Sequence, residues 1–205
     1  MSMVETVIRK ELWDVGARLA ELQLGTVERL LKVRSIAIAA SADATPFHPA
    51  NAAGTLAYQH GTFALRNEFV GDVWRVDRLD GVEATVNDAL RVRVVFSNVD
   101  VACSDSMKPR PRSHKGAGAE RVCMGNLFGS LPEFAPRPRD EWATFYLMVD
   151  ESGAAELTRP VVERGTFTAY LERNYLSNGD DLNRSALSLH DGDAADGFDP
   201  AVVRK

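Results

Sequence analysis

The spacing of apolar residues changes near residue 72, and this change constrains the fold more than any other feature of the sequence. Before it, apolar side chains recur every three or four residues, which is the period of an amphipathic helix. The first such series is Val4, Ile8, Leu12, Val15, Leu19 and Leu22. After it, apolar and polar residues alternate, which is the period of a strand with one buried face. We therefore expect an α+β domain in which N-terminal helices pack on an antiparallel sheet built from hairpins.

Three helices are expected in residues 1–71. The first ends at Gly25, because glycine favours the left-handed conformation that often follows the last turn of a helix. The second runs to about Ala40. The third begins after Asn51, which can act as its N-cap, and ends near Gly71.

The first hairpin is expected over residues 72–98. The Asp80-Gly81 pair between two β-rich segments is a strong turn signal, since both residues tolerate a positive φ angle. The clearest strand is Leu90–Phe96, in which valines alternate with two arginines. This alternation predicts one buried face and one partly polar face, as in an antiparallel sheet.

A second hairpin is expected over residues 142–162, with Pro160 placing its second strand near a sheet edge. Thr166 can then cap a last, C-terminal helix. The apolar residues assigned to that helix are Phe167, Tyr170, Leu171 and Tyr175.

The sequence suggests a single α+β domain over residues 1–177, followed by a tail. Residues 1–71 form the helical part, and residues 72–177 form the sheet and the C-terminal helix. Residues 178–205 are polar and contain six aspartates against three basic residues. We expect this acidic tail to be mobile and disordered.

Composition and charge narrow the class of protein. The chain has 205 residues, of which 45% are hydrophobic and 26% charged, with a net charge of −5. These values exclude a collagen-like or wholly disordered chain. No apolar run reaches membrane-spanning length, and charges within residues 1–10 argue against a signal peptide. The two cysteines, Cys103 and Cys123, fit a reducing compartment, so we expect a cytoplasmic protein that does not contact membranes.

A basic segment at residues 108–121 is the strongest local anomaly. It carries a net charge of +4 in a chain whose remaining residues sum to −9. Five of the nine prolines lie between residues 109 and 138, so a long loop is expected here. Arginine and lysine suit phosphate groups, and glycines let backbone amides approach an anion. The candidate anion- or nucleic-acid-binding residues are Lys108, Arg110, Arg112, Lys115, Gly116, Gly118 and Arg121. The alternative is a solvated basic loop without a ligand.

Other chemistry has weaker support. Cys103, His114 and Cys123 lack the paired spacing of a zinc site, so we expect no metal and no cofactor. His60, Glu83 and Asp100 are candidate acid–base groups. Whether they converge on the basic segment is left open by the sequence.

Three functions remain. The first is a non-enzymatic cytoplasmic protein that contacts nucleic acid, or a nucleic-acid-handling protein, through the basic loop. The second is an enzyme acting on a phosphorylated small molecule or nucleotide, with the same loop as its anion clamp. The third is an acidic inhibitor or scaffold that binds a basic partner. The stripe Val4–Leu22 also predicts a homodimer, with packing on the chain's own sheet as the competing outcome.

Overall fold

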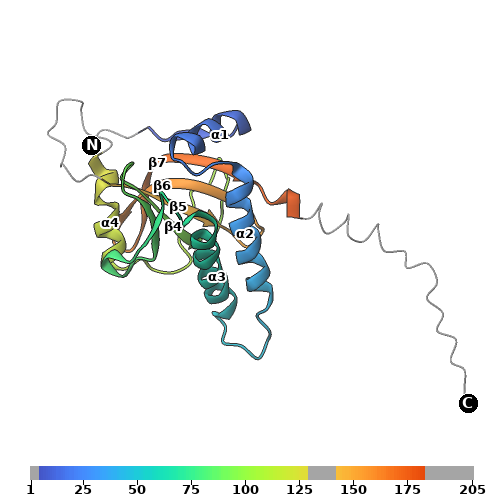
Figure 1. Ribbon diagram of the computed structural model, residues 1–205. Helices are drawn as coiled ribbons and strands as arrows, with labels where there is room; N and C mark the ends of the chain where they lie inside the picture. Colours follow the sequence, from blue (N-terminus) through green and yellow to red (C-terminus); the bar gives the residue numbers. More distant parts are fainter. Residues whose placement is uncertain (1–4, 129–141, 183–205) are drawn as a thin grey trace, which may run out of the picture.

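The computed structural model describes residues 5–128 and 142–182 (Figure 1). The α+β class expected from the sequence is confirmed. The helices are α1 (Leu12–Glu21), α2 (Val27–Ala42), α3 (Ala52–Phe69) and α4 (Ala117–Phe128), with a short 3₁₀ turn, η1 (Leu79–Gly81). The strands are β1 (Val7–Arg9), β2 (Arg75–Asp77), β3 (Ala84–Asn87), β4 (Val92–Asn98), β5 (Ala143–Val149), β6 (Ala155–Glu163) and β7 (Thr166–Ser177).

The strands form one mixed sheet in the order β1-β7-β6-β5-β4-β3-β2. Strands β2, β3 and β4 are antiparallel neighbours, and so are β5, β6 and β7. The pairs β4–β5 and β1–β7 are parallel, so the expectation of a purely antiparallel sheet is wrong. Parallel neighbours need a crossover connection, and α4 lies within the one that joins β4 to β5.

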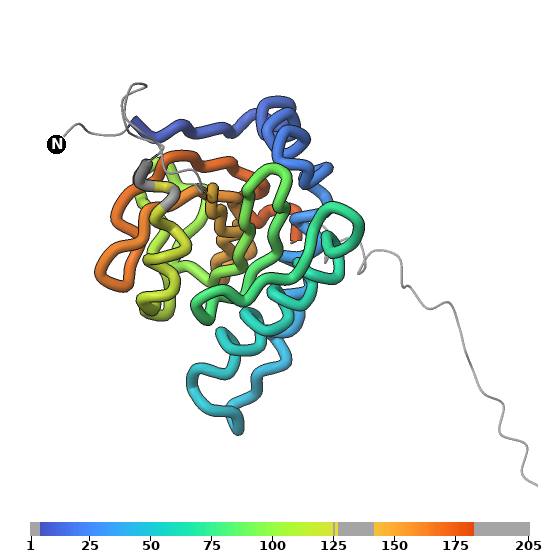
Figure 2. Tube along the Cα trace, turned by 60° about the vertical axis from the view of Figure 1, so that its left-hand side comes forward, coloured from blue at the N-terminus to red at the C-terminus, as the bar shows by residue number. Residues whose placement is uncertain are grey.

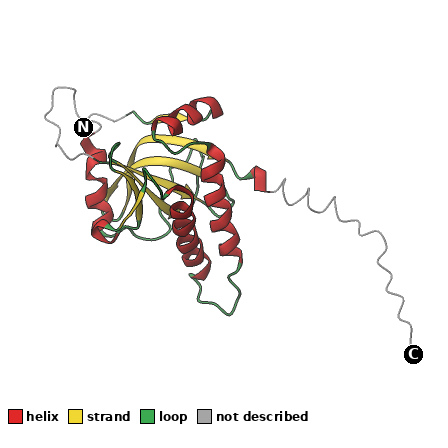
Figure 3. Ribbon diagram, in the orientation of Figure 1, coloured by secondary structure: helices red, strands yellow, loops and turns green. Residues whose placement is uncertain are grey.

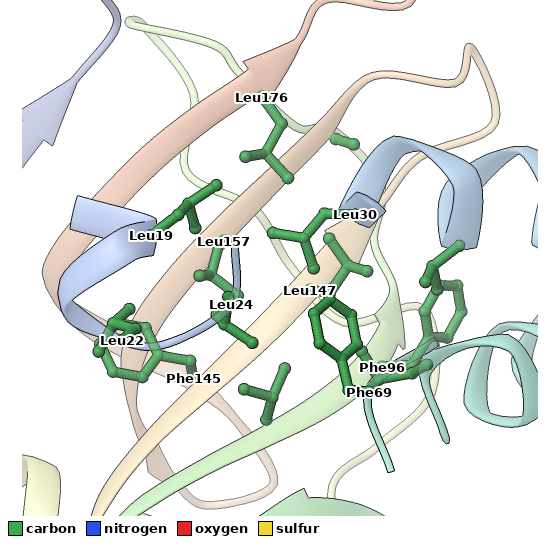
Figure 4. Close-up of a cluster of buried hydrophobic side chains, with 14 of the residues drawn as sticks. Leu19, Leu22, Leu24, Leu30, Phe69, Phe96, Phe145, Leu147, Leu157 and Leu176 are labelled. Atoms are coloured by element: carbon green, nitrogen blue, oxygen red, sulfur yellow. The ribbon is translucent and has the colours of Figure 1, made fainter. Parts of the chain in front are cut away.

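Helices cover both faces of the sheet. Figure 1 and Figure 3 show α2 and α3 on one side and α4 on the other. Helices α2 and α3 run side by side and project beyond the sheet (Figure 2). The larger core lies under α1, α2 and α3, where leucines of the helices meet apolar residues of β4, β5 and β6. Figure 4 shows this cluster, with Leu19, Leu24 and Leu30 facing Leu147 and Leu157. Burying each of these side chains contributes about 1.5–3 kcal/mol.

The second face of β4 carries polar side chains, as expected, but it is buried like the first. Arg93 is only 4% exposed because α4 covers this face. Its guanidinium carbon lies 5.1 Å from the ring centre of Trp142, and its Nη1 donates to the Val122 carbonyl oxygen of α4. On the opposite face of β4, α3 packs closely. A Cβ atom on Gly61 would lie 2.5 Å from the ring of Phe96.

The N-terminal apolar stripe is divided between two elements. Residues 7–9 form β1 beside β7, and α1 begins only at Leu12. Val15 and Leu19 are buried against the chain's own sheet, whereas Leu12 is exposed. Part of the stripe is therefore buried within a single chain, without a second copy. The homodimer stays a prediction.

The expected C-terminal helix is wrong, because residues 166–177 form β7. The apolar residues there have helix-like spacing because the register between β6 and β7 shifts at irregularities. Phe167 pairs with Val162 and Tyr170 pairs with Pro160, so both aromatic side chains lie on the same face of the sheet. A bulge between them adds one residue to β7, so side chains on the same face are three residues apart here and not two.

Pro160 lies in an interior strand, not near an edge. The ladder between β5 and β6 ends at Thr158, so Pro160 lies beyond it. Asn126 of α4 bridges this gap, since its amide nitrogen donates to the carbonyl oxygens of Thr144 and Pro160. Its amide oxygen accepts the Thr144 N–H at 3.0 Å. The Asn126 side chain thereby takes the place of a neighbouring strand for Thr144 and for the Pro160 carbonyl oxygen, where β5 and β6 no longer pair.

Residues just after β7 contact helix α2. Asp181 pairs with Arg34 of α2 at 2.5 Å, and the Arg34 side chain is 3% exposed. The same guanidinium donates to Ser177 Oγ and to the Gly153 carbonyl oxygen. The adjacent guanidinium holds the pKa of Asp181 well below its usual range. The start of the predicted tail is thus held against α2 by Asp181, and the predicted domain boundary stays a prediction. The rest of the predicted tail, 183–205, lies outside the described residues, as does 129–141.

No helix among the described residues combines the length and the apolar composition needed to cross a membrane.

Replacing Asp181 by alanine is expected to lower stability by about 1–3 kcal/mol, because the Arg34 charge stays buried without its carboxylate. Thermal unfolding would show a Tm lower by about 3–10 °C. The difference from the unmutated chain should shrink as the pH falls below about 4, because the Asp181 carboxylate of the unfolded chain takes up a proton there, whereas Arg34 keeps that of the folded chain ionised to lower pH. Asp180→Ala is the matched control, since Asp180 is exposed and bonds only to Asn178 among the described residues. Equal Tm values for the two variants would contradict the assignment.

Candidate functional site

The basic segment at residues 108–121 is not a single loop. Residues 98–100 run beside residues 110–112, with Val99 bridging Pro111 and the Arg112 N–H donating to the Asn98 carbonyl oxygen at 3.2 Å. Helix α4 then begins at Ala117. The expectation of a long irregular loop over 109–138 is thus wrong for residues 117–128. The candidate residues therefore lie in three different parts of the chain: residues 101–109, residues 110–116 and helix α4.

Buried polar groups hold the excursion, residues 101–109, against the sheet. Glu156 of β6 is fully buried and pairs with Arg173 of β7 at 2.7 Å. The same carboxylate accepts the Cys103 N–H, and Arg173 donates to the Ser104 carbonyl oxygen at 2.9 Å. Because both charges are paired and hydrogen-bonded, their burial is tolerated and fixes the path of the excursion.

Two of the five basic side chains are neutralised by carboxylates. Arg112 pairs with Glu151 in the turn after β5, and Arg121 of α4 pairs with Asp80 at 3.0 Å. Lys108 and Arg110 are exposed on the excursion and at its end. The Lys108 ammonium lies 5.9 Å from the ring centre of Tyr170. The positive field of the segment is therefore weaker than its sequence charge suggests.

The two candidate glycines differ in the space around them. A Cβ atom on Gly118 would lie 2.0 Å from the Asp80 carbonyl oxygen, so this glycine lets α4 approach the η1 turn. Gly116 has nothing within 4 Å of the position of a Cβ atom. Gly116 leaves room for a ligand, whereas the Gly118 position is filled by packing.

Lys115 is held in place by the turn between β6 and β7. Its N–H donates to the Gly165 carbonyl oxygen at 2.8 Å, and the Gly165 N–H donates to Glu120 of α4 at 3.0 Å. Arg164 and Gly165 both have positive φ angles, 52° and 76°, as a tight hairpin turn requires. The backbone of Lys115 is thus fixed between a hairpin and a helix.

The Lys115 side chain is a partly buried cation with no counter-ion among the described residues. Its Nζ donates to Ser97 Oγ at 2.8 Å and lies 5.5 Å and 5.6 Å from the ring centres of Tyr146 and Phe167. Within the described part of the chain, no carboxylate lies within ion-pair distance of Nζ. Burial lowers the pKa of Lys115 to about 8, since loss of water disfavours the charged form.

Lys115 lies between two adjoining cavities. The larger, of about 400 Å³, lies between α3 and residues 112–115, at the carboxyl ends of the parallel strands β4 and β5. The smaller, of about 200 Å³, includes Gly116 in its wall. Tyr58, Ser113 and Lys115 line both cavities, and Thr55, Ser97, Asn98, Arg112 and Glu151 are among the residues lining the larger one. A crevice at the carboxyl ends of parallel strands is a common position for ligand binding in open sheets.

The three candidate acid–base residues do not converge. His60 is exposed on α3. Glu83 accepts hydrogen bonds from Arg66 and Arg78, and Asp100 accepts the Arg110 N–H at 2.7 Å. None of the three lines either cavity. The described residues therefore bring no carboxylate–histidine cluster to Lys115.

The cysteines are free thiols. Burial raises the pKa of Cys103 and of Cys123 to about 12, so both stay neutral at physiological pH. Among the described residues, no group of three or more acidic, histidine or cysteine side chains is placed to hold a metal ion.

Sequence reasoning identified Lys115 but missed the groups around it. Thr55 and Tyr58 come from α3, and Ser97 is the last residue but one of β4, so these side chains lie outside the basic segment in sequence. A polar residue at the end of an apolar strand is the one local signal that points to Ser97.

Comparison of the chain with models of protein families, with curated proteins and with solved structures finds no match.

Replacing Gly165 by alanine is expected to disturb Lys115. A Cβ atom there would lie 1.8 Å from the His114 ring, in addition to the strain of the positive φ angle. We expect a loss of about 2–4 kcal/mol in denaturant unfolding. In NMR titration, the lysine midpoint near pH 8 should move toward about 10.4.

Gly81→Ala is the matched control, because Gly81 has a φ angle of 74° but nothing within 4 Å of a Cβ position. It should lose about 1 kcal/mol from backbone strain and leave the Lys115 titration unchanged. A Gly165→Ala variant that behaves like Gly81→Ala would contradict the role of the hairpin turn.

Proposed function

We propose that this protein binds a small anionic ligand, bearing a phosphate or carboxylate group, in the larger cavity beside Lys115. One observation carries the proposal: Lys115 is a desolvated cation at the cavity wall with no carboxylate partner among the described residues. A buried charge without a partner is costly, and a bound anion would remove that cost.

The dimensions of the cavity support a small molecule. Its volume of about 400 Å³ is within the usual range for small-molecule sites. Its wall carries the hydroxyl groups of Thr55, Tyr58 and Ser113, which can donate or accept hydrogen bonds. A phosphate on a sugar or a nucleotide would meet both a cation and hydroxyl groups there.

Arg112 supplies a second cation at the same cavity, and Glu151 competes for it. The Arg112–Glu151 pair is exposed, with 45% and 75% of the two side chains accessible. Exposed ion pairs contribute little stability, so a ligand phosphate can replace Glu151 at small cost. Arginine then offers two parallel N–H groups to the ligand.

The proposal shares its phosphorylated small-molecule ligand with the second function expected from the sequence, which was an enzyme. It is a binding function, because His60, Glu83 and Asp100 lie outside both cavities. Contact with nucleic acid stays a prediction for the outer part of the segment. Lys108 and Arg110, both exposed and without a carboxylate ion pair among the described residues, would carry that contact.

Isothermal titration calorimetry with inorganic phosphate, glycerol phosphate and adenosine monophosphate tests the proposal. Lys115→Met should weaken binding by about tenfold or more, because it removes a charge-assisted contact in a desolvated site. Lys108→Met is the matched control and should bind as the unmutated chain does. The same titration with single- and double-stranded oligonucleotides tests nucleic-acid contact. Absence of binding by all three phosphates, or an equal effect of the two lysine variants, would overturn the proposal.

Affinity should fall as the pH rises from about 7 to about 9.5, because Lys115 loses its proton in this range. Glu151→Gln should strengthen phosphate binding by about twofold to fivefold, since the competing carboxylate is removed. Isothermal titration calorimetry at several pH values measures both effects. A pH-independent affinity, or weaker binding by Glu151→Gln, would show that the anion sits elsewhere.

A further inference from the structure

We propose that Lys115 reacts with the carbonyl group of an anionic aldehyde or ketone and holds it as an imine. This inference rests on the proposed function, because the anionic group of the ligand must first enter the cavity beside Lys115. It adds the chemical class of the ligand, a phosphate- or carboxylate-bearing carbonyl compound, and a covalent role for the lysine.

The position of the amine supports nucleophilic attack. The Lys115 side chain lines both cavities, so a ligand in either one can reach it. Its neighbours Tyr146 and Phe167 present aromatic rings, and desolvation of a lysine favours its neutral, nucleophilic form. A neutral amine can still donate an N–H to Ser97 Oγ, so this hydrogen bond leaves the nitrogen lone pair available.

Three of the titratable groups packed around the amine stay neutral near neutral pH. Burial raises the pKa of Tyr58 on α3, of Tyr146 on β5 and of Cys123 on α4, so these groups stay neutral. Residues 112–115 contribute the always-charged Arg112 and the exposed His114. The remaining charged groups nearby are Glu120 of α4, bonded to the Gly165 N–H, and Glu151, paired with Arg112.

Arg112 and Lys115 divide the recognition between them. Both side chains line the larger cavity, three residues apart in one connection that is bonded to β4 and to the hairpin turn. Arg112 holds the phosphate or carboxylate group, to whose binding the charged form of Lys115 contributes, and the neutral form of Lys115 meets the carbonyl carbon. Binding both ends of the ligand turns a bimolecular reaction into one within the complex, which raises its rate.

The reaction balances without an oxidant or reductant. The lone pair of the neutral Lys115 nitrogen attacks the carbonyl carbon and forms a C–N bond. The carbonyl oxygen takes up two protons, from the attacking nitrogen and from solvent, and leaves as water. The nitrogen then gives its remaining proton to solvent, which leaves a neutral imine. One amine and one carbonyl compound thus give one imine and one water molecule.

Borohydride trapping with pyridoxal phosphate, an aldehyde that carries a phosphate group, tests the inference on the full chain. Borohydride donates a hydride to the imine carbon, and the nitrogen takes a proton from water, which leaves a stable secondary amine. Peptide mapping by mass spectrometry then compares the labelling of Lys115 with that of Lys108. Lys115 should react at least about tenfold faster, and its rate should rise from about pH 7 to about pH 8.5, opposite to the trend of phosphate affinity.

Lys115→Arg separates the inference from the proposed function. This variant keeps a cation that binds phosphate but has no amine that can form an imine. We expect it to lose the label at position 115, while calorimetry measures its phosphate affinity separately. Pyridoxal, which lacks the phosphate, should label Lys115 of the unmutated chain about tenfold more slowly, and excess inorganic phosphate should protect it.

Each outcome decides between the two claims. Phosphate binding with Lys115 labelled no faster than Lys108 would overturn the imine and leave the binding function intact. Fast labelling of Lys115 by pyridoxal and pyridoxal phosphate alike, without protection by phosphate, would keep the reactive lysine and overturn the anionic ligand. Because the peptide map is made on the unmutated chain, the comparison of Lys115 with Lys108 holds even where a variant fails to fold.

Discussion

The parallel pairing of β4 with β5 is the constraint on which the rest of the structure depends. Two parallel neighbours cannot be joined by a tight turn, so the chain must cross one face of the sheet between them. That crossing places residues 99–116 and α4 opposite α1, α2 and α3, and both faces of β4 become buried. The same pairing brings the carboxyl ends of β4 and β5 together, and the larger cavity lies beside them.

Buried polar groups make this arrangement specific. Glu156 and Arg173 pair beneath the excursion, Asn126 replaces missing hydrogen bonds between β5 and β6, and Arg34 pairs with Asp181. In each case a long-range contact satisfies a group that would be costly to bury alone. Lys115 differs from these residues, because its partly buried ammonium meets a hydroxyl group and aromatic rings but no carboxylate among the described residues. This difference is the reason for placing the ligand there.

The net charge of a segment is a poor guide to its surface potential. The basic segment has five cationic side chains in the sequence, yet Arg112 and Arg121 meet carboxylates from distant turns. Lys115 points into the protein and Lys108 lies beside Tyr170. Partners that are remote in sequence thus place the basic side chains of this segment in different environments. One of these environments is a cavity.

The sequence by itself determined the α+β class, the positions of α2 and α3, the strand core of β4 and β5, and Lys115 as a candidate for anion binding. These features depend on local periodicity, turn residues and residue chemistry. Tertiary structure alone decided that residues 166–177 form a strand, because bulges in β7 give Phe167 and Tyr170 the spacing of a helix. It also decided that α4 forms in a glycine-containing segment, since Asn126 and Val122 are fixed by contacts with β4, β5 and β6. The environment of Lys115 comes from α3, β4, β5 and the β6–β7 turn, which no local pattern brings together; only packing of the whole chain removes water from that amine.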